Sequence, residues 1–404
     1  MRIYKITTPS FYRKFRCAGA ACLNSCCYGW NIHIDKKHHQ RYINASDADI
    51  KELARKHLTL TRMGKNKYSI IDFNQNGACP FLTTDKLCKI HQKMGEGALS
   101  STCANYPRTG KIWGEQLRHN MALSCSEVAR LVLFDRESML LHQQDNLVAM
   151  GRKINVAHAS FDQKNQLIHL FAWNLIGAPA DDVEANLLAL AQFILFLQRI
   201  DFDLAGRLAE VEAFYESLLV ALQRGELTSP QSDSEQATLL KLRALIAIFE
   251  EKRSYSARTR ALQQSYNVTL HYLNLTQSDN IADIQHKFTR INQQWRQLCT
   301  SSCLAEPYVL RNYLQYHLYK LYFPGHDLNL MMRNFYRIVM DYFCLKVLVT
   351  VESLHQELTE NDIILLFADY HQRVHHSAPM ADQLDRAINE INGGDDLSCL
   401  LLLG

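Results

Sequence analysis

The stretch FRCAGAACLNSCCYGWNIHID, residues 15–35, decides how the first third of this 404-residue chain can fold. It carries four cysteines, two of them adjacent. Eight of the chain's 12 cysteines lie in this third: Cys17, Cys22, Cys26, Cys27, Cys79, Cys88, Cys103 and Cys125. In a reducing compartment, clustered cysteines are more often metal ligands or redox groups than disulfides. We therefore predict a thiolate-held metal or iron–sulfur centre in this region.

The segment MRIYKITTPSFYRKF, which opens the chain, predicts a cytoplasmic location. It is polar and basic, and no apolar run of the kind found in a signal peptide follows it. The chain has no stretch of about 18 uninterrupted apolar residues, so we expect no transmembrane helix and no membrane partner. A hydrophobic content of 47% with 21% charged residues is typical of a folded globular protein.

The pattern of the chain changes near residue 135. Before it, short segments alternate with turn residues; after it, apolar residues recur at helical spacing. We predict a mainly α protein, with a small irregular cysteine-rich metal-binding domain over 1–135 and an irregular all-α domain over 136–404. The first part should contain a helix over 47–58 and a strand over 68–73. Helices are predicted over 181–199 (capped by Asp181), 204–224, 237–251, 255–275, 280–298, 306–322, 328–350, 359–375 and 380–392, with a polar loop over 227–236.

Charge is distributed unevenly along the chain. Residues 1–135 contain 21 Lys and Arg against 10 Asp and Glu, and residues 136–404 contain 23 against 31. A basic half is compatible with nucleic acid or an acidic partner, but also with compensation of thiolate charge or with an ordinary solvated surface. Beyond this balance nothing points to nucleic acid, so we expect no nucleic-acid partner.

The spacing of the cysteines favours a multi-iron cluster or two neighbouring sites. The order does not form the two paired knuckles of a zinc finger. Adjacent cysteines such as Cys26 and Cys27 project apart, which suits one small ion poorly. The CxxxCxxC loop of radical S-adenosylmethionine enzymes is also incomplete, because its third position is Gly29. Soft thiolates select zinc, iron–sulfur clusters or Cu(I); the alternative for any single member is a small buried apolar residue.

Several of these elements resemble known families. CCYGW (26–30), CPFL (79–82), CKIH (88–91) and CANYPR (103–108) are similar to a cysteine domain that chelates zinc or iron in bacterial proteins. Over essentially the whole chain, with MALSCSEVARLVL (121–133) and NYLQYHLYKLYFP (312–324), the pattern resembles the bacterial flagellin lysine N-methylase family. The resemblance implies methyl transfer from S-adenosylmethionine to lysine ε-amines of flagellin, with an iron–sulfur cluster. We expect a 4Fe–4S cluster, with the eight cysteines as its candidate ligands.

The sequence departs from this family and from ordinary methyltransferases at two points. The family often has Cys-Pro where this chain has Cys125-Ser126, which alters the turn but not the thiolate. No Gly-rich loop follows a strand, and no alternation of strands and helices predicts a doubly wound sheet. The cysteine region is therefore the first place to expect the methyl-donor pocket.

Four residues beside the cysteines are candidates for binding or catalysis. Trp30 and Tyr106 are candidates for cofactor binding. Arg108 is a candidate to grip the carboxylate of S-adenosylmethionine, with a structural ion pair as the alternative. Asp35 is a candidate base or ion-pair partner for the substrate amine, with capping of the following turn as the alternative.

Three further patterns have a structural interpretation that we prefer. The histidines nearest the cysteines (His33, His91 and His119) are more simply surface or core groups than metal ligands. Cys299 and Cys303 share one helix face but are only two thiols, so burial is the simpler interpretation. The tyrosines from Tyr308 to Tyr322 suit core packing with hydroxyls at the rim better than an amine groove.

Two functions remain open from the sequence. The first is the methylase just described, with flagellin as partner; the oligomeric state is not specified. The second is a non-enzymatic binding module in which zinc or iron is purely structural and the helical domain docks a protein.

Overall fold

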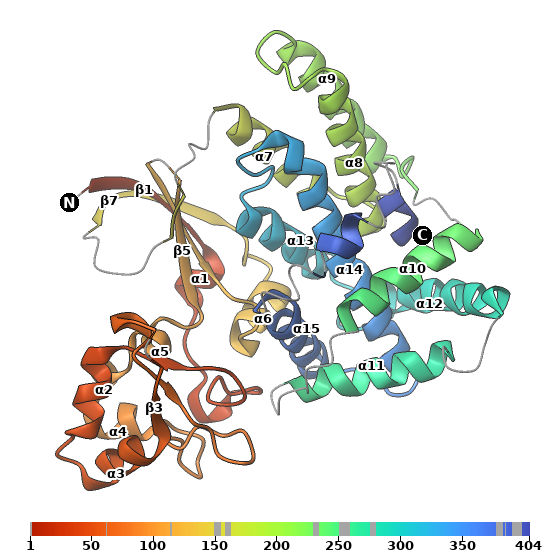
Figure 1. Ribbon diagram of the computed structural model, residues 1–404. Helices are drawn as coiled ribbons and strands as arrows, with labels where there is room; N and C mark the ends of the chain where they lie inside the picture. The colour runs from red at the N-terminus through yellow and green to blue at the C-terminus, as the bar shows by residue number, and fades with distance from the viewer. Residues whose placement is uncertain are drawn as a thin grey trace.

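The computed structural model describes residues 2–61, 63–113, 115–148, 155–157, 163–228, 234–249, 259–274, 280–376, 383, 385–389 and 398–404. It is mainly α, as predicted (Figure 1). A cysteine-rich body, residues 16–107, lies at one end, a five-stranded sheet lies above it in Figure 1, and the helices form the remainder.

The five-stranded sheet was not anticipated from the sequence. Its order is β7-β1-β6-β5-β8, with β1 parallel to β6 and antiparallel to β7. The strands are β1 (Arg2–Pro9), β5 (Arg108–Trp113), β6 (Gln116–Met121), β7 (Leu141–Val148) and β8 (Asn155–Ala157). The expectation of an all-α second part is therefore wrong for β7 and β8. The edge strand β7 reads LHQQDNLV, which is too polar to show the alternation that marks a half-buried strand.

The cysteine-rich body is inserted between helix α1 (Ser10–Lys14) and strand β5. The predicted helix over 47–58 is confirmed as α3 (Ala48–His57), where the Asp47 side chain caps the helix by accepting from the Ile50 amide. The small core of this body contains Tyr42, Ile50 and Phe81. Its other elements are β2 (His33–Ile34), α2 (Lys36–Ile43), β3 (Leu58–Leu60), β4 (Ser69–Ile71), α4 (Lys89–Met94) and α5 (Ser101–Asn105).

The helical region surrounds one large apolar core that reaches from α1 and α6 to the end of the chain. Its helices are α6 (Ser126–Phe134), α7 (Gln163–Gly177), α8 (Val183–Arg199), α9 (Leu208–Gln223), α10 (Glu235–Phe249), α11 (Arg260–Leu273), α12 (Ile281–Ser301), α13 (Tyr308–Leu321), α14 (Met331–Ser353), α15 (Glu360–His375) and η6 (Ser398–Leu402). None of the helices in the described ranges has the length and apolarity required to span a bilayer.

The predicted helices of the second part agree with the structure apart from details at their ends. The cap of α8 is Asp182 rather than Asp181, because the Asp182 carboxylate is the one that accepts from the Ala185 amide. Helix α7 was not predicted; its polar positions interrupt the apolar stripe. Residues 229–233 of the predicted loop over 227–236 lie outside the described residues, and positions 235 and 236 belong to α10. The predicted helix over 380–392 lies largely outside the described residues.

The tyrosines of α13 pack in the core, as the sequence favoured. The hydroxyls of two of them, Tyr316 and Tyr319, are not at the rim but donate to backbone carbonyls of strands β6 and β1. Tyr316 binds the Met121 carbonyl at 2.8 Å, and Tyr319 binds the Thr7 carbonyl at 2.9 Å. Helix α13 is thereby fixed across β1 and β6.

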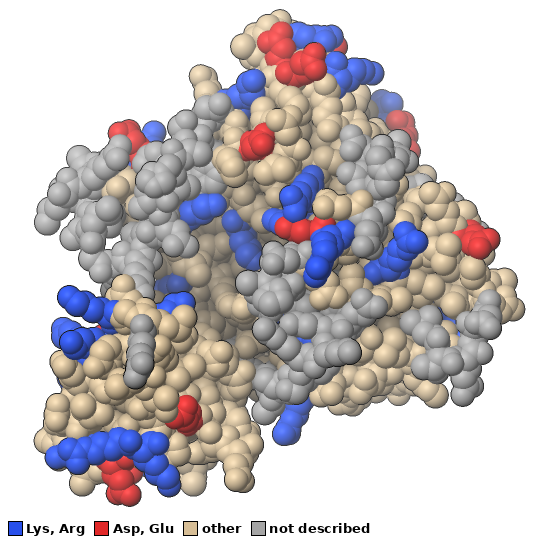
Figure 2. All heavy atoms as spheres, viewed as in Figure 1, with Lys and Arg blue, Asp and Glu red and all other residues tan. Residues whose placement is uncertain are grey.

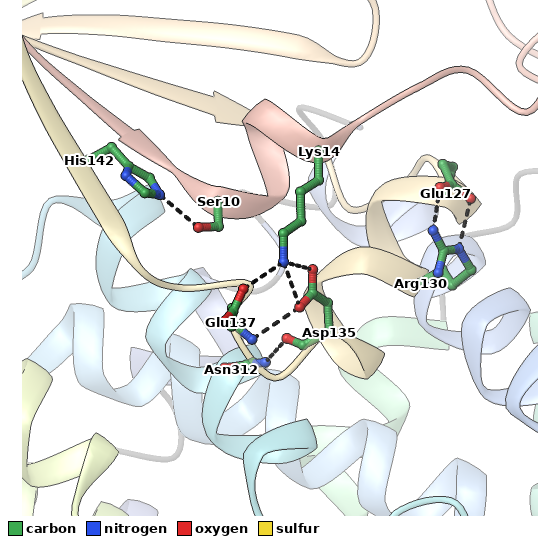
Figure 3. A network of polar contacts seen from close by, with 8 residues as sticks. All are labelled: Ser10, Lys14, Glu127, Arg130, Asp135, Glu137, His142 and Asn312. Atoms are coloured by element: carbon green, nitrogen blue, oxygen red, sulfur yellow. Dashed lines mark hydrogen bonds and ion pairs between the residues drawn. The ribbon is translucent and has the colours of Figure 1, made fainter.

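A polar network joins α1 to the end of α6 and to α13 (Figure 3). The Lys14 ammonium donates to Asp135 at 2.8 Å and to Glu137 at 3.1 Å, and the Asn312 side chain donates to the Asp135 carbonyl. Residue 135 is therefore not part of a flexible linker between two domains. Side chains from before and after it in the sequence are joined by hydrogen bonds and ion pairs.

The basic side chains of the N-terminal part lie largely on its outside. Figure 2 shows Lys and Arg gathered along the edge of the cysteine-rich body where α3 lies in Figure 1, and Arg55 and Lys56 of that helix are exposed. Lys93 pairs instead with Asp47 and Asp49. This arrangement favours a solvated surface over compensation of thiolate charge for these residues.

Candidate metal centre

The cysteines of the body are brought together by loops that are far apart in the sequence but adjacent in space. The Cys79 amide donates to the Cys27 carbonyl at 2.8 Å, which joins the first cysteine loop to the CPFL segment. A bridge between Leu82 and Cys88 folds that segment back on itself. Cys27, Cys79, Cys88 and Cys103 then pack in the same apolar core.

Cys88, Cys103 and Cys125 occupy the first turns of helices. Cys88 and Cys125 are the N-cap residues of α4 and α6, and the Cys103 amide is held by the Ser100 hydroxyl within the first turn of α5. Amides of the first turn are directed at the Cys88 and Cys125 sulfurs, an arrangement that favours a thiolate. The sequence therefore places these sulfurs where a backbone dipole supports negative charge.

The Cys26 sulfur is the common neighbour of the group. Its charge acts on the thiols of Cys27, Cys79, Cys88, Cys103 and Cys125. The thiols of Cys26 and Cys27 also share a hydrogen bond, which, together with burial, raises the pKa of the Cys27 thiol far above its usual value. Sulfurs from residues 26 to 125 thus lie within electrostatic reach of one another.

Burial governs the protonation of these thiols. Burial, with a smaller contribution from the neighbouring thiols, raises the pKa of Cys79, Cys103 and Cys125 to about 12. At neutral pH these three groups are therefore neutral thiols. A soft cation would reverse this balance, because it stabilises several thiolates at once and releases their protons.

Cys22 lies at the edge of the group. The Cys22 sulfur is 3.4 Å from the Ser126 hydroxyl and acts on Cys125, so it adjoins the N-terminus of α6. Ser126 therefore contributes a polar contact at the position where the family often has proline. Cys17 is exposed.

In the part of the chain that the structure describes, no three His, Cys, Asp or Glu side chains are positioned to bind one metal ion together. The thiols are neighbours whose number, softness and mutual repulsion fit a bound metal or cluster. Eight of them exceed the four that a single zinc ion takes.

Trp30 and Tyr106 come together beside Cys26. The Trp30 indole N–H donates to the Cys26 carbonyl at 2.6 Å, and its ring centroid is 5.5 Å from that of Tyr106. The Tyr106 hydroxyl is 3.0 Å from the Ser124 hydroxyl, which is 2.7 Å from Nε2 of His376. Two aromatic faces thus border the cysteine group on the side where α15 ends.

Asp35 and Arg108 make contacts of other kinds. Asp35 caps α2, where it accepts from the His38 and Ser101 amides and from the His38 ring at 2.7 Å. Burial opposes its ionisation, but these hydrogen bonds outweigh burial and lower its pKa. The capping interpretation is confirmed, and the carboxylate is too fully engaged to serve as a base. The exposed Arg108 guanidinium lies over the Phe15 ring at 5.2 Å.

The sequence analysis overlooked the histidines of α15. The run HQRVHH, residues 371–376, carries histidines four apart on one helix face, and His376 reaches the Tyr106–Ser124 pair. Of the histidines next to cysteines in sequence, His91 is exposed and His119 stacks on Tyr12, in line with the surface or core roles expected of them.

A separate cavity of about 330 Å³ lies in the helical region between the starts of α8 and α13 and the end of α12. Glu184 and Lys346, a buried ion pair at 2.9 Å, form part of its wall. Cys299 also lines it, but none of the cysteines of the N-terminal body does. The cavity is therefore not part of the candidate metal centre.

Comparison with known proteins agrees with this geometry. Residues 169–403 match the FliB lysine N-methylase C-terminal domain, and residues 16–126 match a zinc- or iron-chelating domain. The chain is 27% identical to lysine-N-methylases of Salmonella typhimurium and Salmonella choleraesuis, each over 100% of both chains. It is 32% identical to the flagellar biosynthetic protein FliU of Salmonella muenchen over 36% of this chain and 86% of that protein. No solved structure matches. The chain belongs to the FliB lysine N-methylase family, and it carries a zinc- or iron-chelating domain over residues 16–126.

Proposed function

We propose that this protein transfers the methyl group of S-adenosylmethionine to lysine ε-amines of flagellin in the cytoplasm, and that its N-terminal thiolates hold an iron–sulfur cluster of the 4Fe–4S type. The observation that carries the proposal is the gathering of Cys27, Cys79, Cys88 and Cys103 around Cys26, beside two aromatic faces. Membership of a lysine N-methylase family supplies the reaction class.

The ligands of the cluster would come from the five gathered cysteines, with Cys22 and Cys125 next to them and the exposed Cys17 the most distant candidate. When bound, an iron centre in such a site supplies a group that can bind and polarise a cofactor. Trp30 and Tyr106 would attract the sulfonium of the methyl donor to their ring faces. Arg108, at the start of β5, would bind its carboxylate through two N–H groups.

Flagellin is the acceptor that fits the relatives best, because one of them is named a flagellar biosynthetic protein. Figure 2 shows the surface hollowed between the cysteine-rich body and the helical region, which leaves room for a protein chain to approach. A structural zinc in a binding module remains the competing function.

One experiment separates these functions. The protein is purified without oxygen, its iron, zinc and acid-labile sulfide are measured, and flagellin co-expressed with it is analysed by mass spectrometry. We expect a brown protein with iron and sulfide, and flagellin heavier by whole methyl groups on lysine. A colourless zinc protein with unmodified flagellin would favour the binding module and contradict the proposal.

A further inference from the structure

Helices α13, α14 and α15 bring a carboxylate and three histidines together in the core. The carboxylate is Asp341 on α14, and the histidines are His317 on α13 and His371 and His375 on α15. None of them belongs to the cysteine group. Asp341 is fully buried, and His317 and His371 are each 2% exposed. We refer to these four residues as the histidine–aspartate cluster.

Hydrogen bonds fix the orientation of Asp341 and His375. One Asp341 oxygen accepts from Nε2 of His375 at 2.9 Å, and the other accepts from the Tyr370 hydroxyl at 2.8 Å. An ionised carboxylate can only accept, so Nε2 of His375 carries a proton and Nδ1 keeps the basic lone pair. This is the geometry in which a carboxylate orients a histidine base.

The charges of the cluster support the same assignment. Burial would raise the pKa of Asp341, but the His375 ring, His317 and the Tyr370 hydroxyl outweigh it and hold that pKa at about 2. Burial lowers the pKa of His375. Burial also lowers the pKa of His317 to about 3 and that of His371 well below its usual value. The cluster is therefore one negative charge among neutral imidazoles.

The neighbours of His375 hold its ring in place. The His371 ring stacks on it with centroids 4.8 Å apart and planes 14° from parallel. His317 lies 5.9 Å away. The other titratable groups that face the cluster from its three helices include Tyr313, Tyr316, Lys320, Arg337, Cys344, Tyr370 and His376.

The cluster opens to the surface only through His375. Its side chain is 21% exposed, against 0% for Asp341. It lies in the last turn of α15, next to His376, which contacts Ser124 and through it Tyr106. In Figure 1, α15 lies beside α6, and the Asn24 side chain of the first cysteine loop donates to Asp369 of α15 at 2.5 Å. The open end of the cluster thus borders the aromatic side of the metal centre.

We propose that Asp341 and His375 form the general-base pair that removes a proton from the lysine ε-ammonium before methyl transfer, an inference that rests on the proposed function. A lysine ammonium, with a pKa of about 10.4, has no lone pair to donate at neutral pH. His375 Nδ1 takes one N–H proton, and the electron pair of that bond stays on nitrogen. The amine then attacks the methyl carbon, and the carbon–sulfur electron pair leaves with the neutral thioether.

Asp341 stabilises the imidazolium that forms, and its hydrogen bond keeps Nδ1 directed at the substrate. The partly exposed His375 ring then returns its proton to solvent, which resets the base for the next methyl group. His371 acts as a positioning residue, because its stacked ring limits rotation of His375 without adding charge.

The test is the pH dependence of methyl transfer. The variants His375→Gln and Asp341→Asn are compared with wild type and with the exposed control His355→Gln, using labelled S-adenosylmethionine and flagellin. We expect His375→Gln to lower the rate at neutral pH by about 100- to 10,000-fold, with the deficit shrinking as the pH approaches about 10, where lysine deprotonates unaided. A loss that is equal at every pH, or no loss, overturns the proposal. Because Asp341 is buried, its variant is first checked for folding by circular dichroism.

A second measurement does not require activity. Nitrogen-15 spectra of histidine-labelled protein are recorded with and without n-butylamine, which mimics the lysine side chain. The His375 Nδ1 signal, assigned by its absence from the spectrum of His375→Gln, should move when n-butylamine is added. If wild type leaves flagellin unmodified but the shift is present, flagellin is the wrong acceptor and the amine site stands. If n-butylamine leaves the Nδ1 signal unmoved, the amine site is overturned whatever flagellin shows.

Discussion

The cysteine-rich body and the helical region bury their functional groups by different means. The body has a small apolar core in which part of the space is taken by thiols whose ionised forms repel one another. The helical region buries a carboxylate and histidines, but there each charge is matched by a hydrogen bond within a large core. The first arrangement is completed by a metal, whereas the second is complete in the chain itself.

The largest difference between the two regions should appear when a single thiolate is removed. Serine at Cys26, Cys27, Cys88 or Cys103 keeps the size of the side chain but removes the soft anionic donor, so we expect loss of the cluster and of flagellin methylation. The matched control is Cys299→Ser in the helical region, which we expect to cost only about 1–2 kcal/mol of stability.

Methylation is read from the mass of flagellin in cells that carry each variant, with expression levels checked alongside. Unchanged methylation in all four variants of the body would show that these cysteines take no part in catalysis.

Chelation of the metal should affect the two regions differently. Metal binding to structural thiolate sites contributes on the order of 10 kcal/mol to folding, so the body should lose most of its stability when the metal is removed. Hydrogen exchange on the intact protein measures this: amides of α3 should exchange faster after chelation, while those of α14 stay protected. Equal loss of protection in both helices would contradict the division drawn above.

Acid should weaken the helical region through its buried histidines. Burial, reinforced by Arg118, lowers the pKa of His169 from 6.5 to about 3. Between pH 6.5 and about 3, His169 is therefore protonated in the unfolded chain but neutral in the folded chain. The free energy of unfolding should not depend on His169 above pH 6.5. Within this window it should fall by up to about 1.4 kcal/mol for each unit by which the pH is lowered.

Urea midpoints of wild type and His169→Gln at a series of pH values measure this slope. The variant should show a shallower dependence on pH, and identical slopes would exclude His169 as a source of acid sensitivity.

The smallest effect is expected at the exposed contact between α1 and the end of α6, next to the point where the body is inserted. Lys14 pairs with Asp135 and Glu137, but its side chain is 43% exposed, so solvent screens the pair. Lys14→Met should cost at most about 1 kcal/mol, with the difference shrinking at high salt. A larger loss in thermal unfolding would mean that the network in Figure 3 acts as a unit.

Local features of the fold could be predicted from sequence because their causes are local. Asp47 and the apolar spacing after it define α3, and the cysteine pattern indicated the metal-binding body. The sheet could not be predicted, because β1 finds β6 and β7 more than a hundred residues away and only their pairing makes them strands. His375 could not be identified for the same reason: its carboxylate is Asp341, on another helix.

The insertion point of the cysteine-rich body has one further consequence. The chain enters the body after α1, at Phe15, and returns to the sheet at Arg108, whose guanidinium lies over the Phe15 ring. Because entrance and exit are adjacent, we expect a rearrangement inside the body on metal binding to leave the distance between α1 and β5 unchanged. We expect the helices to be assembled before any metal arrives, so that loading becomes the last step in building the enzyme.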